Sequence, residues 1–343
     1  MNRWILALCA FVLAAAVLPA QVDLAVYQDA FQDFADAAVG SLASTATSGL
    51  SWSPAHIGQF PHLGLGLTVG AAMMPYEAVA PVLVMLGVAL PAELDFMQTY
   101  GVPLPAAAID ARIGGFGIPF DIGLKIGFIP DQVKALLGGV QADYFIAGGD
   151  FRFAILQDKG FVPALSVGIG YSYLKGGVGI ADVTTGTTVD IHDLMVADGL
   201  PPGDTYELVF SDPDLDFTWE SHVIEAKVQL SKNLLIFTPH VGASAAYALA
   251  SAVGGGLLSD VEYLRNGVPG TWSEVVDAFD NAGETPPTED QGFTVAADAP
   301  AGWAFKVFGG TSVNLLFLRL DLDAYYNVLT GAYGGNVNFR FEL

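Results

Sequence analysis

The sequence predicts an all-β fold, a transmembrane antiparallel β-barrel, and three observations lead to it. The 343-residue chain is 52% hydrophobic and only 14% charged, with a mean hydropathy of +0.48, a balance typical of membrane proteins. Beyond the first twenty residues, the long uncharged stretches 78–92 and 233–259 are interrupted by Pro or Gly, so they are poor candidates for spanning helices. Instead, apolar and polar residues alternate over tracts of about ten residues, the length that a tilted strand needs to cross a bilayer.

Residues 1–20 have the layout of a secretory signal peptide. Arg3 precedes an apolar run from Trp4 to Ala20, and a small residue ends that run before Gln21. Cleavage after Ala20 would remove Cys9, the one cysteine of the chain, so the exported protein would contain neither a disulfide nor a thiolate metal site. We therefore expect export to the cell outer membrane.

The next segment, residues 21–61, is expected to form a plug ahead of the barrel. Between Val22 and Leu42 apolar residues recur every three or four positions, which predicts an amphipathic helix of about five turns. The polar faces carry aspartates, which disfavours a position on an anionic lipid surface. The helix is therefore expected either inside the barrel or against its base. Its apolar face is formed by Leu24, Tyr27, Phe31, Phe34 and Leu42.

Residues 62–343 are expected to form the barrel. In Leu316–Val328 the even positions are apolar, and the odd positions carry the charges. Similar tracts cover 109–113, 118–128, 140–146, 165–173 and 215–230, the last with a change of phase near His222 that predicts a bulge. We count ten to fourteen tracts, with 78–90 and 257–264 the least regular. Because single-chain bacterial barrels have even strand numbers, about 12–14 strands are expected.

The final tract, Asn336–Leu343, alternates in the same way. With Phe339 and Phe341 on one face, it resembles the last strand of outer-membrane barrels, the segment that the barrel-insertion machinery recognises. The expected partners are therefore that machinery and outer-membrane lipid.

The net charge of −23 is concentrated in two segments. Gly177–Asp216 carries nine acidic residues and no Lys or Arg, and Asp260–Asp298 carries nine more with Arg265 as the one basic residue. We expect both to be long external loops of a barrel whose other turns are short. Such an acidic surface disfavours nucleic acid as a partner. The run Ser211–Asp216 lacks the ligand spacing of a calcium loop, so a solvated acidic turn is the preferred interpretation, and no metal is expected.

A short motif precedes the first strand of the barrel. It comprises Ser53, Pro54 and Ala55, followed by Phe60, Pro61 and a glycine-rich strand. This region resembles FadL-type long-chain fatty acid transporters, in which an Asn-Pro-Ala motif lies in an N-terminal hatch; here Ser53 takes the Asn position. The resemblance implies passage of hydrophobic molecules past a plugged lumen.

Charged residues on the polar faces of the tracts are expected to point into the lumen. The strand phases assign Arg112, Lys125, Arg152, Lys227, Lys306, Arg319, Asp321, Asp323 and Arg340 to this set. An ion-pair ladder that stiffens the barrel is the preferred interpretation; a track that binds carboxylates is the second.

A catalytic function is not expected. The chain has no G-x-S-x-G or H-E-x-x-H motif, and the best constellation is His222 and His240, which could face the lumen near Glu225 or Ser244. A lipid hydrolase built on those histidines remains a rival. The sequence thus predicts an outer-membrane channel without cofactors for small hydrophobic or amphipathic molecules such as fatty acids. The alternative is a structural or surface-binding barrel whose acidic external loops carry the function.

Overall fold

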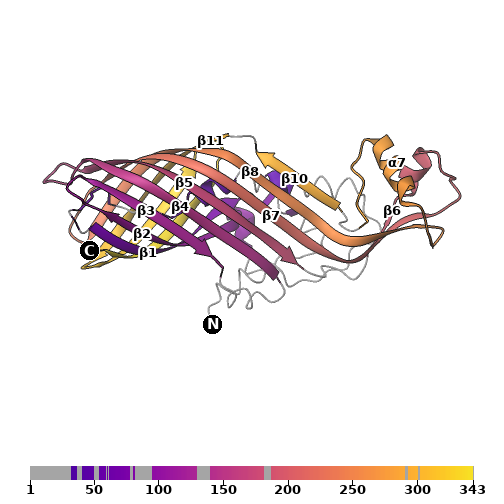
Figure 1. The fold of residues 1–343 in the computed structure, drawn as a ribbon, viewed down its shortest axis with the longest axis horizontal. Helices are drawn as coiled ribbons and strands as arrows, with labels where there is room; N and C mark the ends of the chain where they lie inside the picture. Colours follow the sequence, from indigo (N-terminus) through magenta and orange to yellow (C-terminus); the bar gives the residue numbers. More distant parts are fainter. Residues whose placement is uncertain are drawn as a thin grey trace.

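The structure, a computed structural model, describes residues 32–36, 41–49, 54–58, 60, 62–77, 80–81, 95–129, 140–180, 187–289, 293–299 and 302–342. Ten antiparallel strands close into a barrel (Figure 1). They are β1 (His62–Met74), β2 (Val102–Gly114), β3 (Phe120–Phe128), β4 (Val140–Leu156), β5 (Ala164–Ile180), β7 (Tyr206–Ser231), β8 (Phe237–Arg265), β11 (Gly302–Leu315), β12 (Leu318–Asn327) and β13 (Tyr333–Glu342).

The ring closes through the pairing of β1 with β13, in a register that runs from Gly64 opposite Glu342 to Met73 opposite Tyr333. Closure gives every strand of the ring two neighbours, so the ring has no edge strand. The barrel class is as predicted, whereas the ring has ten strands rather than the expected 12–14. One reason is that residues 257–264, counted as a separate tract, belong to β8, which is 29 residues long. Of the other irregular tract, 78–90, only residues 80–81 are described.

The two ends of the barrel differ in their connections. At one end, which we call the short-turn end, neighbouring strands are joined by the turns 115–119, 157–163, 232–236 and 316–317. At the other, the long-connection end, most strands are separated by longer segments, such as residues 75–101 between β1 and β2. Both the start of β1 and the end of β13 lie at the short-turn end, because Gly64 pairs with Glu342.

Side chains alternate between lumen and exterior along the strands. In β1 the outward residues Leu63, Leu65, Leu67 and Val69 are about half exposed, while Thr68 is buried inside. The same phase gives the other strands an exterior of Leu, Ile, Val and Phe. Tyrosines and a tryptophan appear on this exterior towards the long-connection end; they are Tyr100, Tyr171, Trp303, Tyr326 and Tyr333. An apolar exterior with an aromatic boundary is the surface of a barrel in lipid. No helix in the described ranges is long and apolar enough to cross a membrane.

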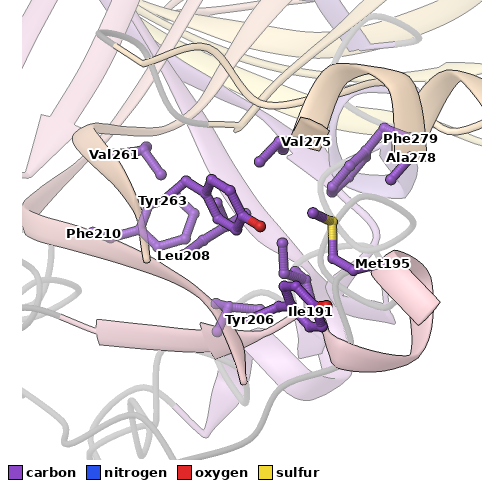
Figure 2. Close-up of a cluster of buried hydrophobic side chains, with 11 residues drawn as sticks. Ile191, Met195, Tyr206, Leu208, Phe210, Val261, Tyr263, Val275, Ala278 and Phe279 are labelled. Atoms are coloured by element: carbon purple, nitrogen blue, oxygen red, sulfur yellow. The ribbon is translucent and has the colours of Figure 1, made fainter. Parts of the chain in front are cut away.

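Two strands continue beyond the barrel and form an external extension, residues 187–211 and 260–289, that has its own core (Figures 1 and 2). β7 and β8 extend to Tyr206 and Arg265, and they are joined by β6 (Thr187–Asp190), α6 (His192–Ala197), β9 (Val268–Pro269) and α7 (Trp272–Ala282). A separate strand, β10 (Phe293–Ala299), pairs with residues Ser251–Leu257 of β8. The buried cluster comprises Val189, Ile191, Met195, Tyr206, Leu208, Phe210, Val261, Tyr263, Val275, Ala278 and Phe279.

The prediction that both acidic segments are loops is therefore wrong in part. Ser211–Asp216, interpreted as a solvated turn, lies within β7. Its ladder with β8 has a register shift between Ser211 and Asp214, so the irregularity is a bulge. The alternation of apolar residues at 206, 208 and 210 and the helical spacing in Trp272–Ala282 place one face of each element in the small core. The carboxylates occupy the other faces.

At the tip of the extension, Asp204 joins the two strands. Its carboxylate accepts hydrogen bonds from Asn266 Nδ2 at 2.8 Å and from Arg265 Nη2 at 2.6 Å. These bonds hold the pKa of Asp204 below its ordinary value, so the carboxylate stays ionised at neutral pH.

The core of the extension should respond to truncation independently of the barrel. Phe279 is completely buried, so Phe279→Ala is expected to destabilise the extension by about 3–5 kcal/mol through lost burial and a residual cavity. Limited proteolysis in detergent should then cleave the chain within 187–211 or 260–289 and leave the rest of β7 and β8 and the other barrel strands intact. Asp277→Ala, on the same helix but outside the buried cluster, should leave the cleavage pattern unchanged. Cleavage throughout the barrel strands in Phe279→Ala would contradict this independence.

Candidate functional site: the occupied lumen

The lumen is occupied by a part of the chain that precedes β1, residues 41–49 and 54–57, which we call the lumen segment (Figure 1). Residues 41–46 are helical, and Leu42 and Ala46 are buried. Before it, residues 32–36 are also helical. They contact the part of β7 that lies away from the short-turn end, where the rings of Phe34 and Phe217 have centroids 4.6 Å apart. The segment thus passes through the barrel to the short-turn end, where β1 begins.

Lys125 of β3 holds the end of the helix. Its ammonium donates hydrogen bonds to the carbonyl oxygens of Ala46 at 2.7 Å and Ser48 at 2.5 Å. The last carbonyl oxygens of a helix have no partner within it and carry partial negative charge, so a cation is well placed there. The side chain is buried, and these bonds therefore form away from bulk water.

Other wall residues hold the rest of the lumen segment. Lys306 of β11 donates to Thr47 Oγ1 at 2.5 Å, and Arg152 of β4 donates to the carbonyl oxygen of Pro54 at 2.6 Å. The amide of Ala55 donates to Ser231 Oγ at 2.7 Å. Three cations on three strands therefore bind the segment, Lys125 and Lys306 at residues 46–48 and Arg152 at Pro54.

The wall beneath this segment is an ion-pair network. Arg112 lies between Asp121 and Asp150, with Nη1 to Oδ1 and Nη2 to Oδ1 distances of 2.5 and 2.7 Å, and is fully buried. Arg152 Nη2 contacts Asp121 Oδ2 at 2.6 Å, and Lys227 Nζ contacts Asp150 Oδ2 at 2.8 Å. These three cations and two carboxylates therefore compensate one another away from water.

A second part of the network surrounds the end of the chain and β12. Arg340 contacts Asp321 at 3.0 Å, Arg319 contacts Glu342 at 3.0 Å, and His240 contacts Asp323. Lys306, which holds Thr47, also contacts Glu225 at 2.8 Å. The network therefore links the wall to the lumen segment through shared cations.

The lining of the lumen changes character along the barrel axis. On β4, Arg152 and Asp150 lie towards the short-turn end, and buried Ile146 lies towards the other. On β7, Lys227 and Glu225 are followed in the same direction by buried Val223. The inward apolar residues of the long-connection half are Ala72, Met74, Ala106, Ile146, Leu174, Phe217, Val223, Ala246, Ala248, Val253 and Ala304. The long-connection half of the lumen is thus mainly apolar, with buried Ser172, Ser221 and Ser251 among these residues, and the other half carries the charges.

Two cavities show how much space remains among the described residues. The one between the lumen segment and the charged wall measures only about 30 Å³ and is bordered by Thr47, Ser48, Lys306 and Glu225. This is room for about one or two water molecules. A larger one, of about 380 Å³, opens at the long-connection end between Asp36, Met74, Tyr100 and Tyr333. A molecule larger than water can therefore occupy the second cavity, whereas the first has no room for one while the segment is in place.

The structure places the predicted residues as follows. All nine charged residues assigned to the lumen are on inward strand positions, and each of them makes an ion pair or a hydrogen bond described above. Of the hatch-like motif, Pro54 and Ala55 are buried in the lumen, while Phe60 is exposed at the short-turn end. Of the plug-helix face, Phe34 and Leu42 have the positions given above. The remaining predicted residues, Ser53, Pro61, Leu24, Tyr27 and Phe31, lie outside the described residues, as does the expected signal peptide.

The two histidines considered for catalysis do not share a face. His240 is buried inside beside Asp323. The β7–β8 register shifts between His222 and Val223, but the extra residue is Leu249 of β8, and β7 keeps one phase, with Ser221 and Val223 both buried. The predicted change of phase in β7 is therefore wrong, and His222 lies on the exterior, where Nδ1 is 2.6 Å from Tyr171 Oη. The expectation that both could face the lumen is therefore wrong for His222. In the described part of the chain, no group of three or more His, Cys, Asp or Glu side chains could hold a metal ion.

Sequence reasoning missed the partners on the lumen segment. The phase of β7 could have identified Ser231 as inward, since it continues the positions of Lys227 and Gln229. No pattern could have identified the carbonyl oxygens of Ala46, Ser48 and Pro54, because every residue carries one.

Comparisons with known proteins give only distant similarity. No family model and no curated protein matches the chain. Among solved structures, the translocator domain of autotransporter NalP from Neisseria meningitidis is 10% identical with a TM-score of 0.31, over 94% of this chain and 100% of that one. The Ralstonia pickettii toluene transporter TbuX is 10% identical with a TM-score of 0.23, over 84% and 90%. The Pseudomonas putida toluene transporter TodX is 7% identical with a TM-score of 0.25, over 83% and 89%.

Proposed function

We propose that the protein is an outer-membrane channel for small amphipathic molecules that carry an anionic head group, and that the lumen segment is its gate. The observation that carries the proposal is that three wall cations bind a segment of the chain inside a lumen that is mainly apolar in one half and charged in the other. A rigid structural barrel needs no removable segment in its lumen. The proposal follows from the geometry of the lumen itself.

The lining suggests how such a molecule would displace the segment. Its apolar part would lie first in the cavity at the long-connection end, against Met74, Tyr100 and Tyr333, and then along the apolar half of the lumen. Its anionic head would then meet Lys125 and Lys306. A charged acceptor forms a stronger hydrogen bond with an ammonium group than a neutral carbonyl or hydroxyl oxygen does. The head group would therefore compete with Ala46, Ser48 and Thr47 for these two cations and free the segment.

Uptake into liposomes tests this function. The probe should be a fluorescent alkyl sulfonate, because its head group stays charged and it crosses pure lipid slowly. We expect the protein to accelerate its uptake over empty liposomes while glucose, which has no anionic head, stays excluded. Equal uptake of both solutes would indicate an open water-filled pore, and uptake of neither would contradict the channel.

A second candidate function is surface binding by the external extension. The extension favours it because it has a folded core of its own and carries many of the carboxylates of the chain. Deletion of residues 187–205 and 266–289 separates the two functions. The channel proposal predicts that sulfonate uptake survives this deletion, whereas surface binding predicts the loss of attachment of cells to a cationic or protein-coated surface.

A further inference from the structure

The four turns of the short-turn end present an unusual surface. Their tips carry Phe116, Phe161, Leu235 and Leu316, and the side chains of Leu235 and Leu316 are 96% and 94% exposed. Tips of turns that face water are generally polar. One apolar tip would need no explanation, but one on each of four turns around the same end does.

The backbone conformation also disfavours leucine at two of these tips. Leu235 and Leu316 have φ values of 59° and 56°, in the left-handed region that glycine and asparagine adopt readily and leucine rarely does. At both positions, exposure and conformation favour a small polar residue, and the sequence has a large apolar one. Something outside the chain must therefore stabilise these side chains.

The apolar surface of the wall continues into these turns without a boundary. At the long-connection end, tyrosines and Trp303 mark the edge of the apolar exterior, whereas the four turns contain neither Tyr nor Trp. Instead the rings of Phe60 and Phe116 have centroids 5.0 Å apart, and Phe116 and Phe120, on the wall of β3, follow at 6.0 Å. The tips thus belong to the same surface that lipid covers on the strands.

Several polar groups of the neighbouring turns 157–163 and 232–236 are paired with each other. Lys232 forms an ion pair with Asp158 and donates to the carbonyl oxygen of Gly160 at 2.5 Å, so one turn satisfies its neighbour. The amide of Asn233 donates to Asp158 Oδ2 at 2.7 Å, and Leu234 and Phe237 exchange backbone bonds of 2.7 and 3.0 Å. In lipid, where no water is present, backbone polar groups and charges need partners within the protein. The long stem of exposed Lys159 can carry its ammonium towards the head groups.

We propose that the short-turn end does not stand in water but is inserted into the adjoining leaflet of the membrane, with Phe116, Phe161, Leu235 and Leu316 in contact with acyl chains. Lipid is the occupant, because this surface continues the lipid-covered wall. The inference is independent of what passes through the lumen.

Site-specific fluorescence in lipid vesicles tests the proposal. Leu235→Cys and Leu316→Cys, each with Cys9→Ala, would be labelled with an environment-sensitive dye in the full-length protein. Vesicles would contain phospholipid spin-labelled on the acyl chain near the head group. We expect strong quenching at both positions, close to that of Leu124→Cys on the exposed middle of β3, and little at Gly203→Cys on the external extension. Labels at 235 and 316 that respond like the one at 203, and are quenched by aqueous iodide, would overturn the proposal and leave a protein partner as the occupant.

A double substitution should change the urea midpoint of unfolding in one direction if the tips lie in water and in the other if they lie in lipid. Asparagine fits the left-handed backbone better than leucine, so in water Leu235→Asn with Leu316→Asn should raise the urea midpoint of unfolding. If the tips lie in lipid, the same double variant should lower the midpoint in vesicles, since the gain in backbone fit is outweighed by polar side chains in an apolar layer. A raised midpoint would refute lipid insertion.

Discussion

Replacement of Arg112 by Met is expected to lower the free energy of unfolding by about 3–5 kcal/mol. Arg112 is fully buried between Asp121 and Asp150. Methionine fills similar space but leaves two buried carboxylates with one cation fewer. Asp121 keeps Arg152 and Asp150 keeps Lys227, which should hold the effect towards the low end of this range.

The measurement is urea-induced unfolding in lipid vesicles, followed by tryptophan fluorescence. The matched control is Arg265→Met, which removes an arginine that pairs with Asp204 but is about one third exposed, so that solvent screening should make its effect much smaller. Equal losses in the two variants would show that the lumen network does not stabilise the barrel as its burial implies.

Replacement of Lys125 by Met is expected to make the channel leak. The change removes two hydrogen bonds from a charged donor to the carbonyl oxygens of Ala46 and Ser48. With a net value of about 1.5–3 kcal/mol for a bond to a charged group, the population with a displaced lumen segment should rise by roughly tenfold or more. Glucose, which the native protein is expected to exclude, should then enter liposomes at a correspondingly higher rate.

The control for this variant is Lys175→Met, which removes a lysine from an exposed position on β5. It should leave both glucose exclusion and sulfonate uptake unchanged. If Lys125→Met excludes glucose as well as the native protein does, Lys125 does not hold the gate, and the cation is only a part of the stabilising network.

Some of this architecture could be predicted from the sequence, because a strand has a strict period of two. The alternation around Lys125 and Arg152 determines that both side chains point away from the apolar face, and hence into the lumen. The change of phase predicted near His222 was wrong, because apolar residues such as Phe217 and Val223 face inward there and imitate the exterior face. The extra residue of the bulge is Leu249 of β8, and only the pairing of the two strands shows this.

Other features depend on contacts that have no local signature. The number of strands depends on where a long apolar tract turns, and residues 257–264 continue β8 instead of turning. The core of the extension joins residues such as Ile191 and Phe279, which are distant in sequence and lie in segments whose acidic composition suggests loops. The carbonyl oxygens that bind Lys125 and Arg152 depend on the path of the lumen segment through the barrel, which no periodicity specifies.

The central claim, that transport requires the lumen segment to move, can be tested by tethering it to the wall. A Cβ atom at Gly49 would lie 3.9 Å from Cβ of Ala108 on β2, a separation suited to a disulfide. Gly49→Cys with Ala108→Cys, in a chain whose Cys9 is replaced by Ala, should therefore form the bond on oxidation. Because Gly49 has a φ of 81°, the single variant Gly49→Cys serves as the control for backbone strain.

Sulfonate uptake into liposomes should then be measured for the double variant, oxidised and after reduction. If transport requires the lumen segment to move, oxidation should abolish uptake. Reduction should restore uptake to the level of the Gly49→Cys control, and neither single variant should respond to the redox state. Full uptake by the oxidised, cross-linked protein would show that solutes pass while the segment stays in place, and would contradict the gate.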